Sequence, residues 1–169
     1  MLRPIVRYGT SVLQKKAATV TAFDADLHRL IDDMIDTMYA APGIGLAATQ
    51  VGVGLRVCVI DLSVGKRGGD LHVLVNPEFS ERDGMQLEEE GCLSVPGFTA
   101  TVARPQHAVV KARDRDGVER TIDATGLLAR ALQHEIDHLD GVLFLDRLRG
   151  IKRDLIVRKI RKLQRTGKW

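Results

Sequence analysis

The chain lacks the features of membrane-spanning, disulfide-rich and repetitive proteins. Its 169 residues include only two cysteines, which do not make a disulfide framework. No uncharged apolar run reaches the roughly eighteen residues of a transmembrane helix, no charged leader precedes an apolar block, and no internal repeat is present. The hydrophobic content of 44% is enough for one substantial core. We therefore expect a soluble, unexported protein with a single domain over residues 1–169.

The two cysteines differ in their surroundings. Cys58 lies within the apolar run from Leu55 to Leu62, where a cysteine usually behaves as a small buried hydrophobe. Cys92 instead follows three glutamates and a glycine. Cys92 is therefore the better candidate for chemistry.

The segment His134-Glu135-Ile136-Asp137-His138 carries the strongest functional signal. Histidines four residues apart lie on one face of a helix, where both can bind a single metal ion. Glu135 lies beside them, close enough to take a proton from a water at the metal without being a ligand. The arrangement predicts a metal-dependent hydrolase; the alternative is an amphipathic helix with two exposed histidines.

The third metal ligand is not expected downstream of this segment. A third histidine after the turn at Gly141 would occupy the position of Phe144, and the residues after His138 include aspartates but no glutamate. A catalytic site of this kind needs three protein ligands and an open position. The remaining ligand is therefore expected upstream, where Cys92 is preferred over Cys58.

Three segments together resemble the signature set of the peptide deformylases. They are, in chain order, Gly43-Ile44-Gly45-Leu46-Ala47-Ala48-Thr49-Gln50, Glu90-Gly91-Cys92-Leu93-Ser94 and Gln133-His134-Glu135-Ile136-Asp137-His138. The resemblance implies a hydrolase that removes the formyl group from the N-formylmethionine of newly made polypeptides and releases formate. It also implies roles for six residues: Cys92, His134 and His138 as metal ligands, Glu135 as general base and acid, and Gln50 with the backbone N–H of Leu93 as oxyanion donors.

The resemblance also assigns a cofactor and a substrate pocket. It points to one Fe²⁺ ion per chain, while the same ligands accept Zn²⁺, Ni²⁺ or Co²⁺. Because a thiolate ligand suits a reducing compartment, we expect a cytoplasmic protein. The backbone at Gly45 is expected to hydrogen-bond an extended peptide, and the methionine pocket is expected around Ile44, Leu127 and Ala131.

Two residues depart from the family pattern near this pocket. Glu88 and Arg130 stand where related sequences often carry apolar residues. We therefore expect the pocket rim to be unusually polar.

The glycine segment also satisfies, formally, the relaxed dinucleotide fingerprint as Gly43-x-Gly45-x-x-Ala48. That fingerprint needs a strand before it and a helix after it, whereas here a helical pattern precedes and a strand-like run follows. A nucleotide cofactor is therefore not expected.

Hydrophobic periodicity predicts the elements of the first half. Apolar residues at helical spacing from Leu27 to Met38 predict an amphipathic helix that Pro42 ends. Strand-like runs at 57–62 and 71–75 flank a glycine-rich turn at 65–69.

In the second half, a hairpin is expected with arms at 107–113 and 118–124 and positive φ angles at Asp116-Gly117. Thr125 is expected to cap the metal helix, which runs from about Leu127 to Gly141. Its expected buried stripe is Leu128, Leu132, Ile136 and Leu139. This order predicts an α+β fold in which antiparallel sheets pack around the metal-binding helix, with an N-terminal helix and a basic C-terminal helix.

Positive charge is concentrated at the C-terminal end. Residues 147–169 hold ten Lys or Arg and one acid, a net charge of +9, whereas the whole chain carries +3. We expect residues 146–169 to be a helical extension of the same domain, docked by the stripe Ile151, Leu155, Ile156, Ile160 and Leu163. The resemblance suggests that this helix binds ribosomal RNA near the tunnel exit. The alternative is a solvated charged helix, which stays open because Trp169 is the only residue there that could stack on a base.

Two other function classes remain open at this stage. A metallopeptidase would share the helix motif but would cleave internal or unblocked peptides. A non-enzymatic ribosome-binding module would keep the basic helix and would not need Glu135.

Overall fold

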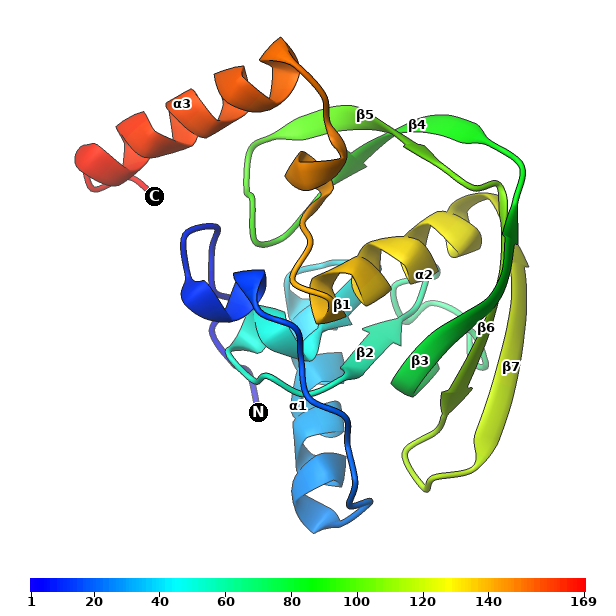
Figure 1. Ribbon diagram of the computed structural model, residues 1–169. Helices are drawn as coiled ribbons and strands as arrows, with labels where there is room; N and C mark the ends of the chain where they lie inside the picture. The colour runs from blue at the N-terminus through cyan, green and yellow to red at the C-terminus, as the bar shows by residue number, and fades with distance from the viewer.

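Helix α2, Gly126–Leu139, lies between two antiparallel sheets in the computed structural model, which describes residues 1–169 (Figure 1). The larger sheet has the strand order β1-β2-β3-β6-β7, and the smaller one pairs β4 with β5. The strands are β1 Gly45–Ala47, β2 Val57–Ile60, β3 His72–Asp83, β4 Gln86–Gly91, β5 Thr99–Arg104, β6 His107–Arg113 and β7 Glu119–Thr125. The predicted α+β class, with antiparallel sheets around the metal-binding helix, is confirmed.

Five further helical segments complete the chain. The α-helices besides α2 are α1 Ala25–Ala40 and α3 Ile151–Arg165, and the short 3₁₀ helices are η1 Ser11–Gln14, η2 Ala48–Val51 and η3 Phe144–Arg147. Helix α1 begins where the Asp24 carboxylate accepts a hydrogen bond from the Leu27 N–H, and it ends just before Pro42, as predicted. None of the α-helices combines the length and the hydrophobicity needed to cross a bilayer.

The hairpin β6–β7 forms where predicted, but its second strand begins one residue later, at Glu119, and its tip differs in detail. Only Gly117 has a positive φ, of 83°, whereas Asp116 does not. The Asp114 N–H donates to the Val118 carbonyl, and the Gly117 N–H donates to the Asp114 carbonyl. The loop is thus longer than a two-residue turn, and one left-handed residue is enough to close it.

Strand β3 extends well beyond the predicted run of 71–75. Its second half, through Asp83, pairs with β6, and the register shifts between Val75 and Glu78 and between Phe79 and Glu81. Such irregularities bend a strand and increase its twist. The long strand therefore joins β2 on one side to the hairpin on the other.

Helix α2 is more buried than its predicted stripe implies. Every residue from Ala129 to Leu139 is buried, whereas Leu128 is only partly buried. Sheet residues cover one side of α2, and the strand pair β4–β5 covers another. Thr125 is the N-cap residue, as predicted, but its side chain makes no capping hydrogen bond, and Gly141, with φ of 77°, lies just beyond the C-cap.

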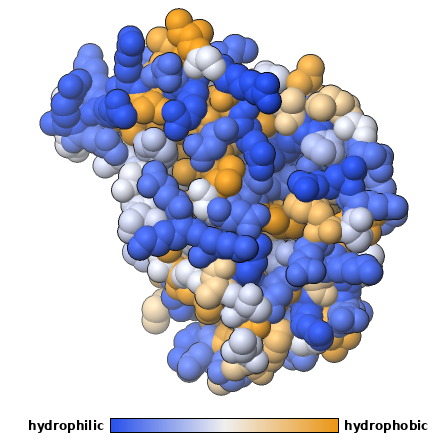
Figure 2. All heavy atoms as spheres, viewed as in Figure 1, coloured by the Kyte–Doolittle hydropathy of each residue, from blue (hydrophilic) through white to orange (hydrophobic).

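Helix α3 projects from the body of the molecule (Figure 1), and hydrophilic residues dominate its surface (Figure 2). Its buried residues are Val157 and Ile160, whereas Ile151 and Leu155, both assigned to the docking stripe, are exposed. The stripe was wrong at these two positions because the first turns of α3 extend past the body. The basic residues of this helix include five that are exposed: Arg158, Lys159, Arg161, Lys162 and Arg165.

Candidate metal centre

The three predicted metal ligands lie together at the centre of the fold. One ligand atom from each of Cys92, His134 and His138 falls within 4.8 Å of the others. The Cys92 Sγ lies 3.3 Å from His138 Nε2, and the two imidazole rings have centroids 4.9 Å apart. The histidines come from successive turns of α2, and Cys92 directly follows β4.

The surroundings of these donors fit a divalent metal ion. Glu90 holds His134 at Nδ1, with 2.6 Å to Glu90 Oε1, which leaves His134 Nε2 as the ligand atom. The Cys92 sulfur accepts hydrogen bonds from the Ser94 N–H at 3.4 Å and from Gln50 Nε2 at 3.6 Å, which fix its position beside the histidines. One thiolate and two imidazoles suit zinc and other borderline divalent ions.

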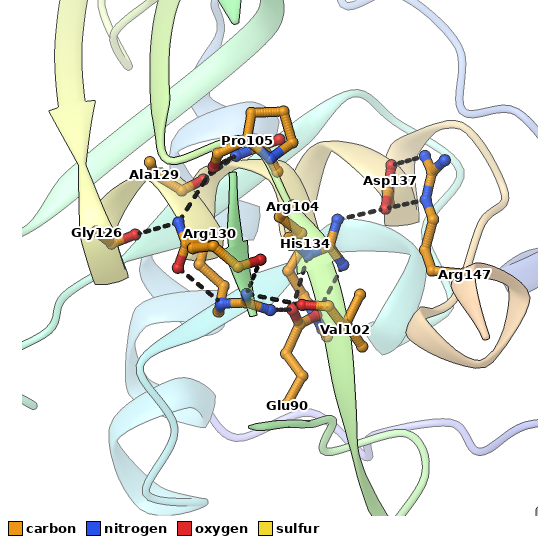
Figure 3. Close-up of polar contacts among 12 residues, drawn as sticks. Glu90, Val102, Arg104, Pro105, Gly126, Ala129, Arg130, His134, Asp137 and Arg147 are labelled. Carbon is orange, nitrogen blue, oxygen red and sulfur yellow. Dashed lines mark hydrogen bonds and ion pairs between the residues drawn. The ribbon is translucent and has the colours of Figure 1, made fainter. Parts of the chain in front are cut away.

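Glu90 lies at the centre of a buried ion network that no sequence pattern predicted (Figure 3). Its carboxylate accepts two hydrogen bonds from Arg104, at 2.7 Å each, and one from Arg130 Nη1. Burial alone would raise the pKa of Glu90, but the hydrogen bonds from Arg104 and His134 hold it far below its usual range. An ionised Glu90 only accepts hydrogen bonds, so the proton of this contact resides on His134 Nδ1.

Asp137, between the two histidines, extends the network to α2's far side. It accepts hydrogen bonds from Arg104 Nη1 at 2.9 Å and from Arg147 Nη2 at 2.7 Å. Since α2 carries Asp137 and β5 ends at Arg104, the network ties both elements to η3. For this ion network, the sequence shows only that carboxylates stand beside the motif residues. Nothing in the sequence indicates which arginines form ion pairs with these carboxylates.

The Glu135 side chain is buried, and its Oε2 atom has no hydrogen-bond partner. Burial raises the pKa of Glu135 to about 7, although the neighbouring His134 opposes the shift. Gly45 makes room for this carboxylate, because a Cβ at Gly45 would lie 2.6 Å from Glu135 Oε1. A carboxyl group in this state can both accept and return a proton near neutral pH.

A cavity of about 530 Å³ opens beside the donors. Its lining includes every predicted site residue except His138, which is fully buried: Ile44, Gly45, Gln50, Cys92, Leu93, Leu127, Ala131, His134 and Glu135. Gln50 Nε2 also donates to Ser94 Oγ at 3.1 Å, and the Leu93 N–H donates to no backbone carbonyl. Two N–H donors and an ionisable carboxyl group thus flank the ligand cluster.

The two departures from the family pattern have different outcomes. Arg130 lines the cavity, but its guanidinium is buried and donates to Gln86 Oε1, Glu90 and the Val102 carbonyl. Glu88 is exposed and does not line the cavity. The expectation that both residues make the rim polar was therefore wrong, because Arg130 uses its donors within the ion network and Glu88 lies outside the cavity.

The remaining alternatives for these segments can be placed on the fold. Cys58 is buried in the core, as predicted. The segment from Gly43 to Ala48 forms the short strand β1 and enters η2, a 3₁₀ helix of four residues. That geometry has no long helix to receive a pyrophosphate.

Known proteins are similar to this chain in sequence and in fold. The curated peptide deformylase of Acidobacterium capsulatum is 52% identical over 169 residues, which are 100% of this chain and 99% of that protein. The crystal structure of a Legionella pneumophila peptide deformylase has a TM-score of 0.92 at 47% identity, covering 99% of this chain and 98% of that one. The Ehrlichia chaffeensis peptide deformylase in complex with actinonin has a TM-score of 0.89 at 39% identity, covering 97% and 98%. Residues 2–154 match the family model for polypeptide deformylase, and the chain belongs to that family.

Proposed function

We propose that the cavity beside α2 binds the formylated end of a new polypeptide and that Glu135, Gln50 and Leu93 act on its formamide bond. The chain is a peptide deformylase, a metal-dependent hydrolase that removes the N-formyl group from N-formylmethionine and releases formate. One observation supports this assignment of residues: the buried Glu135, together with Gln50 and Leu93, lines the same cavity as two of the three metal donors, Cys92 and His134.

Cys92, His134 and His138 would hold the ion, which we propose is Fe²⁺ in the cell, with Zn²⁺, Ni²⁺ or Co²⁺ as substitutes in purified protein. When bound, the ion acts as a Lewis acid, which lowers the pKa of water and polarises the formyl carbonyl. Glu90 keeps His134 oriented through its Nδ1 atom.

Glu135 takes a proton from the attacking water, whose oxygen adds to the formyl carbon. The same carboxyl group then delivers that proton to the methionine nitrogen as the C–N bond breaks, so the products are formate and a free amine. A pKa of about 7 suits both transfers, because the carboxyl group must gain and lose the proton in one cycle.

Negative charge develops on the formyl oxygen during the addition step. Gln50 Nε2 and the Leu93 N–H are the donors that would stabilise it. The loss of one such donor typically costs about 3 to 4 kcal/mol of transition-state stabilisation. Gln50 is itself held in place, because its Oε1 accepts from the Ala47 N–H at 3.0 Å.

The peptide is expected to enter as an additional strand. Strand β1 is an edge of the larger sheet, and Gly45 at its start lines the cavity. An extended chain can hydrogen-bond to such an edge while its side chains occupy pockets. Ile44, Leu127 and Ala131 supply apolar wall for the methionine side chain.

Formate release from formyl-Met-Ala-Ser by anaerobically purified, iron-loaded protein tests this function. We expect release from the wild type, none from unformylated peptide and very little from Glu135→Ala. Cys92→Ala should abolish stoichiometric metal. A folded protein with one bound metal that releases no formate would contradict the proposal, and cleavage of internal amide bonds would favour a metallopeptidase.

We also propose that the enzyme works in the cytoplasm and that α3 binds ribosomal RNA near the tunnel exit. The exposed basic residues lie on a helix that projects from the body of the molecule, where they can contact RNA phosphates. Co-sedimentation with ribosomes at low salt should weaken in the double variant Arg158→Gln, Lys162→Gln, but not in the control Lys15→Gln, Lys16→Gln. Equal binding of both variants would contradict a role for α3.

A further inference from the structure

Trp169, the only tryptophan of the chain, lies against the N-terminal segment around Tyr8. Its Nε1–H donates to the Tyr8 carbonyl at 2.9 Å. Its ring lies 6.1 Å, between centroids, from Phe98, and the Arg7 guanidinium lies 5.8 Å from its centroid. Three separate contacts therefore hold this side chain in place.

The segment that Trp169 contacts is bonded to both oxyanion-donor segments. The Tyr8 N–H donates to the Ser94 carbonyl at 2.9 Å, and the Val6 N–H donates to the Gln50 carbonyl at 2.8 Å. Ser94 directly follows Leu93, and its hydroxyl accepts from Gln50 Nε2. Residues 6–8 therefore connect the backbone of Gln50 to the loop that presents the Leu93 N–H.

The ring of Trp169 also packs beside that of Phe98, which is part of the cavity lining. The turn after Tyr8 fits closely against α3, since a Cβ at Gly9 would lie 2.9 Å from Gln164 Nε2. The end of α3 and the Trp169 that follows it thus contact residues 7–9 and, through Phe98, the wall of the cavity. No metal ligand takes part in these contacts.

We propose that Trp169 is a positioning residue of the active site, which acts through residues 6–8 on Gln50 and Leu93 and through Phe98 on the cavity wall. The inference rests on the oxyanion role proposed for Gln50 and Leu93. Trp169 touches neither donor, so its effect is on their placement. A displacement of about 1 Å at such donors can cost on the order of a hundredfold in rate.

The test compares Trp169→Ala, Trp169→Phe and the control Ile151→Ala, which alters an exposed residue at the start of α3. With formyl-Met-Ala-Ser, we expect Trp169→Ala to lower kcat by about tenfold, and Trp169→Phe, which keeps the ring contact, to recover most of that loss. Ile151→Ala should match the wild type. Metal content and circular dichroism confirm that the variants are folded and loaded.

A second readout uses the fluorescence of Trp169 in the wild-type holoenzyme. Binding of actinonin to the cavity should reduce quenching of Trp169 by acrylamide, because Phe98 joins the cavity wall to the indole. If Trp169→Ala does not fold, this fluorescence measurement tests the positioning role by itself.

A Trp169→Ala protein with wild-type kcat, or quenching that actinonin leaves unchanged, would overturn the positioning role. A wild-type protein that releases no formate would instead overturn the proposed function, so the two failures are distinguishable.

Discussion

The absence of a side chain at Gly45 leaves space for the carboxyl group of Glu135. A Cβ at this position would lie 2.6 Å from Glu135 Oε1 and 3.1 Å from its Cδ. Glu135 is buried, so its carboxyl group has little room to move away. The geometry of the proton carrier and the identity of residue 45 are therefore linked.

We predict that Gly45→Ala lowers kcat by about a hundredfold, because the added methyl group displaces the Glu135 carboxyl. Gly54→Ala is the matched control, since nothing lies within 4 Å of a Cβ there. Formate release measures the effect, and metal content confirms that the site is loaded. Similar activity of the two variants would show that Glu135 adjusts without loss.

Arg130 differs from the other network arginines because it belongs to α2 itself, one turn before His134. Arg130→Met removes the guanidinium while it keeps an unbranched side chain at the cavity. We predict a loss of metal affinity of about 10- to 100-fold, because Glu90 then orients His134 with one partner fewer. The free energy of unfolding should fall by about 3 kcal/mol, as expected for a broken buried ion network.

The matched control for this variant is Arg147→Met, which removes a half-exposed partner of Asp137 and should cost about 1 kcal/mol or less. Competition with a chromophoric chelator measures metal affinity, and urea unfolding measures stability. Unchanged metal affinity in Arg130→Met would show that Arg104 alone fixes Glu90.

At the scale of elements, local patterns predicted what local interactions determine. Helix α1 and the hairpin β6–β7 follow from periodicity and short loops, and the three metal donors follow from helical spacing and the resemblance. The second half of β3 could not be predicted, because its polar run after Asn76 includes Pro77 and is a strand only through its pairing with β6. Strands β4 and β5 were not predicted either, since Glu88, Glu89 and Glu90 give no apolar alternation.

The same distinction applies to the site. The partners of Glu90 lie 14 to 44 residues away in sequence. Such contacts depend on how β4, β5 and α2 come together, which no spacing rule describes.

The end of α2 offers a test at this scale. Gly141 has φ of 77°, and a Cβ there would lie 2.8 Å from the backbone of Gln14. We predict that Gly141→Ala lowers the free energy of unfolding by about 2 to 4 kcal/mol, from the left-handed conformation and the backbone clash together. Gly69→Ala, with φ of 87° but no neighbour within 4 Å, should cost only about 1 to 2 kcal/mol. Urea unfolding measures both, and equal costs would show that Gln14 moves aside.

In the whole molecule, hydrophobic packing surrounds α2, and the basic charge of α3 lies at the surface. The core clusters meet α2 and α1, whereas α3 carries most of its basic residues into solvent. The buried ion network lies between the sheets, so its integrity depends on the complete fold. Peripheral ion pairs, by contrast, respond to pH without disturbing the site.

His107 is the clearest of these pH-responsive groups. Its ring nitrogens lie 2.9 Å from Asp83 and 2.7 Å from Asp123, so it joins three strands of the larger sheet, and Glu81 faces the same group. The hydrogen bonds to Asp83 and Asp123 raise the pKa of His107 above its usual value of 6.5. The folded state therefore binds this proton more tightly than the unfolded chain does.

The sign of the effect on stability follows from that difference. The contribution of His107 is fully present below pH 6.5, the pKa of the unfolded chain, and is lost as the pH rises through the higher pKa of the folded state. We predict that urea unfolding of the metal-loaded protein between pH 5.5 and 9 shows wild type losing stability relative to His107→Gln as the pH rises. Comparison with this variant cancels the titration of groups that both proteins share, Glu135 included. A difference between the two proteins that stays constant with pH would contradict the prediction, and NMR titration of the His107 ring would then show whether its pKa is raised at all.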